Sequence, residues 1–274
     1  MNNPLVSISL GSWQGARTLE ACLHSAKAQT YVPLETVVVE RGSTDGSIEI
    51  AQRLADVYGF GGVERCAQRN LAVQLAKGEY VLLIDQDMRL SPGVVGACVA
   101  AMQANPSLVA VIIPEESFGE GFWAQCKKLE RSFYVGVPWM EGARFCRRAA
   151  FLAVGGYDES LVSGEDWDLS QRLAARGPIG RVDAFIYHDE GRLGLAKTIR
   201  TKYFYATKFA PYARKQEHSA AVAKQTSVFA RYALFLRQPR RLFANPFVGL
   251  GMLFMKTCEF GAGAAALLSA RRRR

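Results

Sequence analysis

Two aspartates, Asp85 and Asp87, stand directly after an apolar run and are separated by one residue. The run, residues 79–84, is short enough to form a strand that is buried on both faces. In an open α/β sheet, ligands bind at the carboxyl ends of the strands. Paired carboxylates there suit a hard divalent cation that keeps open positions for phosphate oxygens. The pair alone is weak evidence, because Asp-x-Asp is also ordinary turn chemistry.

A second pair of carboxylates, Glu165 and Asp166, begins a predicted helix over residues 166–176. The helix macrodipole favours negative charge at this position whatever the function. His188 follows a short apolar run, Val182–Ile186. A histidine that ends a strand is either a hydrogen-bonded structural residue or a metal ligand, and among oxygen ligands an imidazole favours Mn²⁺ over Mg²⁺.

The elements that must position these residues alternate along the chain. Apolar runs predict strands, and apolar residues at helical spacing predict the helices between them. Ser43 or Thr44 is expected to cap the second helix, which runs to about Tyr58. The alternation predicts an α/β fold with a doubly wound, mainly parallel sheet and helices on both faces. The expected strands are 5–10, 34–39, 79–84 and 108–113, and the expected helices are 16–29, about 45–58, 64–77 and 91–104.

Length and cysteine usage bound the class of protein. The 274 residues suffice for one large α/β domain and an appendage. None of the six cysteines has Cys-x-x-Cys spacing, and most lie in apolar surroundings, which is typical of reduced, packed thiols. The first residues lack the basic and apolar regions of a signal peptide. Catalysis is therefore expected in the cytosol.

Charge divides the chain near residue 190. Residues 1–189 hold 17 Lys and Arg against 22 Asp and Glu, a net charge of −5. Residues 190–274 hold 17 against 3, a net charge of +14. Such asymmetry marks a surface that meets anions, either a membrane or nucleic acid. We therefore expect one domain over residues 1–190 and a basic C-terminal region over 191–274.

Six segments follow one another along the chain: Val6–Ile8 with the following loop, Val37–Ser47, Gln68–Asn70, Gly78–Asp87, Arg147–Glu159 and Gly164–Leu169. In this order and at these separations they resemble segments of family 2 glycosyltransferases, which have the GT-A fold. The resemblance covers about residues 4–190. It implies a nucleotide-binding half at about 4–113 and an acceptor half at about 114–190.

The resemblance implies donor-binding roles for Ser12, Trp13, Glu40, Arg69 and Asp85. Glu40 departs from the family pattern, which usually has an aspartate that contacts the base or ribose, so the identity of the base stays open. Trp13 either stacks on the base or covers the core. Arg69 either faces the donor or is a solvated helix residue.

The resemblance also implies a metal site and a catalytic general base. It assigns Asp87 to direct coordination of Mn²⁺ or Mg²⁺, Asp85 to the ribose or a metal-bound water, and His188 to a further ligand position. Asp166 is the implied general base of an inverting transfer. Glu165 would orient it or touch the donor sugar, and Trp167 would form part of the acceptor wall.

The C-terminal region must be interpreted on physical grounds. Residues 195–215 interleave aromatic and basic side chains, which suits a membrane interface or single-stranded nucleic acid. Residues 246–268 are apolar except for Lys256 and Glu259, which can pair at i, i+3. This stretch predicts a helix or hairpin in the interface rather than a span, with Arg271–Arg274 against anionic headgroups. We expect this mainly helical region to bind the cytoplasmic face of the membrane and not nucleic acid.

These expectations combine into a metal-dependent, inverting glycosyltransferase. Its donor would be a UDP- or GDP-sugar, and its acceptor a lipid-linked, polyprenyl glycan; a soluble polysaccharide or protein acceptor stays open. The alternative is a non-catalytic nucleotide- or nucleic-acid-binding α/β module with a basic arm. Its weakness is that four carboxylates, Asp85, Asp87, Glu165 and Asp166, would repel phosphate without a metal. A nucleotidyltransferase shares the sheet and the aspartates but has no use for Glu165 and Asp166.

Overall fold

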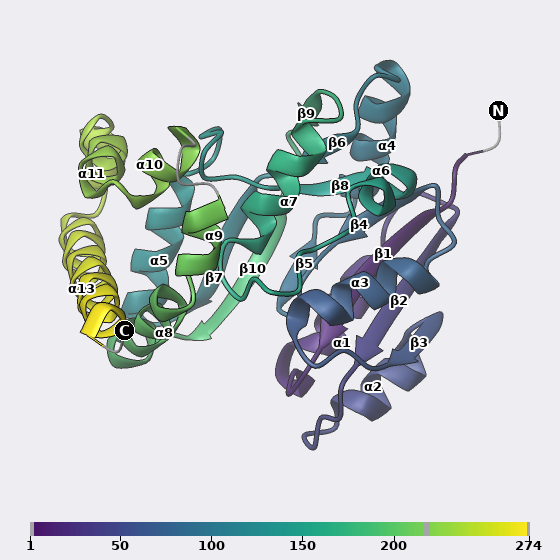
Figure 1. Ribbon diagram of the computed structural model, residues 1–274, viewed down its shortest axis with the longest axis horizontal. Coiled ribbons are helices and arrows are strands. Elements are labelled where there is room, and N and C mark those ends of the chain that lie inside the picture. The colour runs from purple at the N-terminus through teal and green to yellow at the C-terminus, as the bar shows by residue number, and fades with distance from the viewer. Residues whose placement is uncertain (1–2, 216–219, 273–274) are drawn as a thin grey trace. The chain divides into compact units, whose positions relative to one another are not determined.

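The computed structural model describes residues 3–215 and 220–272 (Figure 1). The chain forms two compact units, which are described separately below. Unit 1 comprises residues 1–114, 142–159 and 165–189, and unit 2 comprises residues 115–141, 160–164 and 190–274. Residues 273 and 274, part of the terminal arginine run expected at lipid headgroups, lie outside the described residues.

Unit 1 is built on a seven-stranded sheet of order β3-β2-β1-β4-β8-β6-β9. β1 pairs in parallel with both β2 and β4, and β2 pairs in parallel with β3. β8 is the exception, because it runs antiparallel to its neighbours β4 and β6. The strands are β1 (Val6–Ser12), β2 (Leu34–Glu40), β3 (Val57–Phe60), β4 (Tyr80–Leu83), β6 (Ala110–Ile112), β8 (Ala143–Arg147) and β9 (Ile179–Arg181).

Helices cover both faces of this sheet, because successive strand residues point to opposite sides. Ile8 and Leu82 pack with the buried residues of α1 (Ala16–Lys27), α2 (Ser47–Leu54) and α4 (Val94–Ala104). Val39 and Leu83 pack on the other face with α3 (Arg65–Leu75), α6 (Arg148–Ala153) and α7 (Glu165–Ala174). The predicted doubly wound, mainly parallel α/β fold is confirmed (Figure 1).

The second predicted helix is too long and its expected cap is wrong. α2 starts after Gly46, whose φ of 95° is in the left-handed region, and Asp45 rather than Ser43 or Thr44 accepts from the Ser47 amide at 3.1 Å. α2 ends at Leu54, and residues 57–60 form β3 beside β2. Tertiary pairing of a short β-branched and aromatic segment has overridden its local helical pattern.

A separate, short pairing brings a distant segment beside the aspartates. β5 (Met88–Leu90) follows Asp87 directly, and it pairs antiparallel with the first residues of β10 (Ile186–Arg192). The register places His188 opposite Met88. The Asp189 amide also donates to the Asp87 carbonyl at 2.8 Å. This pairing, which the sequence pattern did not predict, fixes His188 next to Asp87.

Unit 2 is mainly helical around a core of Phe133, Phe235, Leu242, Met252 and Met255. The stretch predicted as an interfacial helix or hairpin is one continuous helix, α13 (Pro246–Arg272). Among the described residues, no helix is long and apolar enough to cross a membrane. The other elements are β7 (Glu115–Glu120), α5 (Phe122–Ser132), α8 (Leu195–Thr207), α9 (Ala210–Lys215), α10 (Ala220–Thr226), α11 (Val228–Leu236) and α12 (Pro239–Leu242).

Candidate active site

The carboxyl ends of β1, β2 and β4 meet at one edge of the sheet, because these neighbouring strands are parallel. Ser12 ends β1, Glu40 ends β2, and Asp85 follows β4. Three residues predicted from separate segments therefore lie along one edge of unit 1. This is the position where open α/β sheets bind ligands.

Gln86, the residue between the two aspartates, fixes the loop after β1. Its side-chain oxygen accepts from the Trp13 amide at 2.9 Å, and its side-chain nitrogen donates to the Trp13 carbonyl at 3.0 Å. A Cβ on Gly15 would lie 2.1 Å from the Gln86 oxygen, so a side chain there would displace the Gln86 amide. The Asp85–Asp87 turn and the Trp13 loop are thereby held together.

Glu40 turns inward. It is fully buried, and one carboxylate oxygen accepts from the amides of Gly42 and Ser43 at 2.7 and 3.0 Å. The other oxygen accepts from the Ser43 hydroxyl. Glu40 therefore organises its own turn, and its predicted contact with a donor stays a prediction.

A cavity of about 390 Å³ opens beside this turn, lined by Trp13, Arg41, Phe60, Gly61, Gly62 and Val63. The Arg41 guanidinium stacks 4.2 Å from the centre of the Trp13 ring and donates to the Val63 carbonyl. Trp13 and Phe60 are 50% and 66% exposed, so Trp13 offers ring surface rather than covering the core. Flat apolar walls with a fixed cation suit a heteroaromatic ring.

Three successive residues of α3 connect the parts of the site. Gln68 donates to the Ser12 carbonyl at 2.7 Å and to the Val39 carbonyl at 3.0 Å, which joins the ends of β1 and β2. Asn70 donates to the Tyr157 carbonyl and accepts from its amide, at 2.9 and 2.8 Å. Arg69 lies between them in the sequence and is only 2% exposed. It is therefore a buried site residue and not a solvated helix arginine.

Arg69 holds three carboxylates together. Its guanidinium pairs with Asp85, and its Nη1 atom lies 3.5 Å from both Glu165 and Asp166. Arg144 makes a second link, since its Nη2 atom lies 3.7 Å from both Asp85 and Asp166. Two arginines thus connect the strand-end aspartate to the carboxylate pair at the start of α7.

Two further side chains complete this cluster. Arg65, from the first turn of α3, pairs with Glu165. The Tyr157 hydroxyl donates to Asp166 Oδ1 at 3.0 Å. Asp166 is about one-third exposed at its side chain, whereas Glu165 is 6% exposed. Asp166 is therefore the carboxylate of the pair that can meet a substrate.

The acidic groups of the site differ in the direction of their pKa shifts. Burial alone would raise the pKa of Asp85, but the neighbouring guanidinium groups, Arg69 foremost, hold that pKa below its ordinary value. Burial raises the pKa of Glu165, and the charge on Asp166 raises it further. Asp85 is therefore a firmly ionised group that already has cationic partners.

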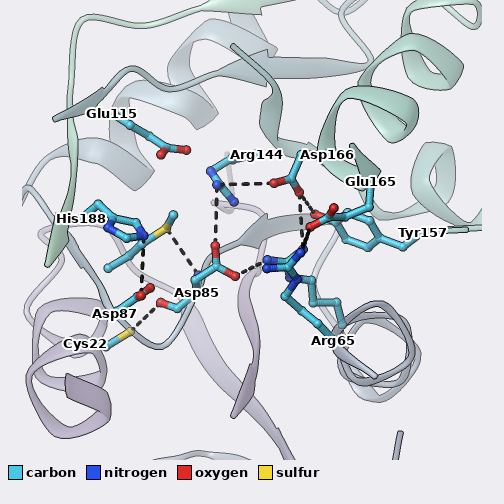
Figure 2. Close-up of polar contacts among 12 residues, drawn as sticks. Cys22, Arg65, Asp85, Asp87, Glu115, Arg144, Tyr157, Glu165, Asp166 and His188 are labelled. Atoms are coloured by element: carbon cyan, nitrogen blue, oxygen red, sulfur yellow. Dashed lines mark hydrogen bonds and ion pairs between the residues drawn. The ribbon is translucent and has the colours of Figure 1, made fainter. Parts of the chain in front are cut away.

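Asp87 and His188 form a second pair on the other side of Asp85 (Figure 2). Asp87 Oδ2 and His188 Nε2 are 3.6 Å apart, and the side chains are 35% and 18% exposed. One small divalent cation can contact both atoms at this spacing. Among the described residues, no group of three His, Cys, Asp or Glu side chains lies close enough to hold a metal.

These donors fit a cation that takes the rest of its ligands from a substrate. A carboxylate and an imidazole leave most positions open for phosphate oxygens and water, and this mixed set is compatible with Mn²⁺. Asp85 is engaged by Arg69 and Arg144, so Asp87 and His188 are the better placed ligands.

The predicted residues therefore form neighbouring parts of unit 1. Trp167, assigned to the acceptor wall, is half-buried on α7, and no structural feature tests its role. Sequence reasoning gave no role to four contributors: Arg65, Gln86, Arg144 and Tyr157. Tyr157 and Gln86 lie inside segments that carried the resemblance, which was the available signal. Arg144 ends the segment 141–144, which was expected beside the sugar without a side-chain role. Arg65 carried no signal, since a single arginine does not reveal which carboxylate it will meet.

The chain matches the model of a protein family described as Glycosyl transferase family 2, over residues 12–152. It is 26% identical over 204 residues to a chondroitin synthase of Pasteurella multocida (strain Pm70), and the match covers 68% of this chain and 20% of the synthase. It is 31% identical over 160 residues to a glucosyl-dolichyl phosphate glucuronosyltransferase of Haloferax volcanii, covering 50% of each chain. The chain spans about one fifth of the length of the chondroitin synthase.

A solved structure with a similar fold is the mannosyltransferase PcManGT from Pyrobaculum calidifontis in complex with GDP-Man and Mn²⁺. The TM-score is 0.62, the sequence identity is 17%, and the alignment covers 98% of this chain and 88% of that one. At this identity the likeness shows the fold alone.

Proposed function

The chain belongs to glycosyl transferase family 2, and from that premise we propose that it is a glycosyltransferase. It would move a sugar from a UDP- or GDP-sugar to an acceptor hydroxyl, with inversion at the anomeric carbon. The observation that carries the proposal is the double link from Asp85 to Asp166 through Arg69 and Arg144. This link supports a rigid site, in which Asp85 at the donor and Asp166, the proposed general base, keep a fixed separation.

The donor base occupies the cavity beside Trp13 in this proposal. Trp13 and Phe60 supply ring surface, and Arg41 supplies donors for the acceptor atoms of a base. The Asp87 and His188 atoms would hold Mn²⁺ or Mg²⁺, which supplies charge to offset the negative charge that builds on the departing diphosphate. PcManGT has a similar fold and forms a complex with GDP-Man and Mn²⁺, which supports a nucleotide-sugar donor and the use of a divalent metal.

Asp166 acts as the general base. Its Oδ1 atom accepts from Tyr157 at 3.0 Å and lies near Arg69, so the carboxylate is oriented. Its Oδ2 atom, 3.7 Å from Arg144, would take the proton from the attacking hydroxyl. Glu165 is nearly buried against Arg65 and Arg69, which suits a positioning role better than that of a nucleophile. An exposed base beside a buried partner carboxylate favours inversion.

The acceptor in this proposal is a lipid-linked, polyprenyl-type glycan. The name of the Haloferax volcanii relative, a glucosyl-dolichyl phosphate glucuronosyltransferase, supports such an acceptor. No specific observation favours the non-catalytic nucleic-acid-binding alternative.

A donor screen tests the reaction. We expect one nucleotide-sugar to raise the thermal unfolding midpoint in the presence of Mn²⁺ and to be consumed when a lipid-linked acceptor is added. A chain that binds no nucleoside diphosphate, with or without Mn²⁺, would contradict the proposed function. Consumption with a soluble glycan acceptor alone would retain the glycosyltransferase but contradict the lipid-linked acceptor.

A further inference from the structure

The charged residues in the middle of α13 face inward. Lys256 and Glu259 are 3% and 2% exposed, and they pair with each other. Lys256 also pairs with Glu130 of α5, and Glu259 lies 3.2 Å from Lys127 of the same helix. A surface helix of a globular protein usually turns its charged face to water. α13 has the opposite arrangement.

The outward face of α13 is correspondingly apolar. Phe247, Leu250 and Phe254 are 81%, 59% and 56% exposed, and they lie on one side of the helix at spacings of three and four residues. Over residues 246–269, all described, the exposed positions carry no charge, and Thr257 alone has a polar side chain. The outer face of α13 is defined here as Phe247, Leu250, Phe254, Gly261, Ala265 and Leu268.

Basic residues stand next to this face. The end of α12 packs on the start of α13, since a Cβ on Gly249 would lie 2.2 Å from the Leu242 carbonyl and 3.4 Å from the Phe243 ring. Phe243 is itself 43% exposed. Arg237, Arg240 and Arg241, within or just before α12, are exposed as well. An apolar strip flanked by arginines is typical of a surface that lies in a membrane interface.

We propose that the outer face of α13 docks on an anionic lipid surface, with Arg237, Arg240 and Arg241 at the headgroups. The inference stands apart from the proposed reaction. Residues 190–274 carry a net charge of +14, which attracts an anionic bilayer and opposes contact with a second copy of the same face. Nucleic acid would meet the charge but would leave the apolar strip in water. The burial of Lys256 and Glu259 explains how α13 can contact lipid while carrying two charges.

Vesicle flotation of the full chain tests the proposal. We expect the wild-type protein to float with phosphatidylcholine–phosphatidylglycerol vesicles in low salt and in molar salt, because apolar burial is not screened. The variant Phe247→Ser/Leu250→Ser/Phe254→Ser should bind at least about tenfold more weakly in molar salt. The variant Arg240→Gln/Arg241→Gln should lose much of the low-salt preference for anionic over purely zwitterionic vesicles.

A matched control removes exposed apolar side chains from unit 1. The variant Val32→Ser/Leu75→Ser/Leu152→Ser alters residues that are 66%, 37% and 42% exposed, and it should float like the wild type. Equal binding by the α13 and control variants would overturn the proposal. So would wild-type protein that ignores vesicles in low salt, or a lipid-free dimer that the α13 variant converts to a monomer.

A second measurement does not depend on the triple variant folding. In Phe254→Trp, brominated phosphatidylglycerol vesicles should quench more tryptophan fluorescence than they quench in the wild type, because the added ring would lie among acyl chains. No additional quenching would overturn the proposal. Displacement of the protein from vesicles by single-stranded oligonucleotides in molar salt would also overturn it.

Discussion

At the scale of single residues, Asp166 is oriented on one oxygen by Tyr157 and is about one-third exposed at its side chain. Asp166→Asn keeps the size and most of the hydrogen bonding but cannot accept a proton. We expect turnover to fall by about 10²–10⁴-fold while donor affinity changes little. Initial rates and a donor titration measure the two effects. Asp183→Asn, on an exposed carboxylate of unit 1, is the control; turnover of Asp166→Asn close to that of this control would exclude Asp166 as the base.

Asp87 is the residue on which metal-dependent binding should depend. Asp87→Ala removes one of the two donors that lie 3.6 Å apart, so the diphosphate would meet the site without its cation. We expect transfer to be abolished and Mn²⁺-dependent binding of UDP or GDP to be lost, as measured by calorimetry with and without Mn²⁺. His188→Gln should weaken the same binding less, because Asp87 remains. Unchanged nucleotide affinity of Asp87→Ala in Mn²⁺ would contradict the metal assignment.

At the scale of elements, the local sequence pattern predicted the strands that are buried on both faces. The runs that became β1, β2 and β4 were predicted because strands buried on both faces leave continuous apolar sequence. β3 and β5 were missed, because four and three residues are too few for a period to show, and their pairing with β2 and β10 decides them.

The candidate site was predictable to the same extent. Asp85, Asp87, Glu165 and Asp166 stand in segments whose order along the chain resembles a family, so their grouping followed from the resemblance. The arginines that contact these carboxylates did not follow from the resemblance. Arg144 meets the acidic cluster through the antiparallel pairing of β8 with β4, which is a long-range feature.

The ion cluster between α5 and α13 makes a prediction about stability. Glu130→Ala leaves Lys256, which is 3% exposed, without a partner on α5. We expect a loss of roughly 3–5 kcal/mol in the free energy of unfolding, measured by urea denaturation. The double variant Glu130→Gln/Lys256→Met should lose less than the two single changes together. Glu116→Ala breaks an exposed pair with Lys128 and should cost roughly 0–1 kcal/mol; an equal loss in Glu130→Ala would contradict the buried cluster.

At the scale of the whole molecule, the two compact units place their charged and apolar groups differently. Unit 1 gathers acidic and guanidinium groups around a candidate reaction site, with Asp85 held ionised by its neighbours. Unit 2 buries a smaller ion cluster and exposes apolar surface. Both units therefore depend on charges that must stay in one protonation state, and this dependence links the stability of each to pH.

The sign of that dependence follows from the pKa shifts. Burial opposes ionisation of Asp85 and Glu130, but neighbouring cations hold the pKa of each carboxyl below its ordinary value. Their contribution to stability is present above the unfolded-state pKa, about 4, and is lost as pH falls through the folded value. Burial raises the pKa of the Cys66 thiol from 9.0 to about 12. That contribution is present below pH 9.0 and is lost as pH rises toward 12.

We therefore expect the thermal unfolding midpoint to be nearly constant between about pH 5 and pH 9 and to fall on both sides. Calorimetric scans across the pH range measure it. Glu130→Gln/Lys256→Met removes from unit 2 a carboxyl whose pKa is lowered, so the fall of the midpoint on the acid side should become shallower. The fall on the alkaline side, to which Cys66 contributes, should persist. Cys66→Ala should have the reverse effect. A midpoint that rises steadily from pH 7 down to pH 3 would contradict the prediction, because the raised pKa of Glu165 would then outweigh the lowered pKa values of Asp85 and Glu130.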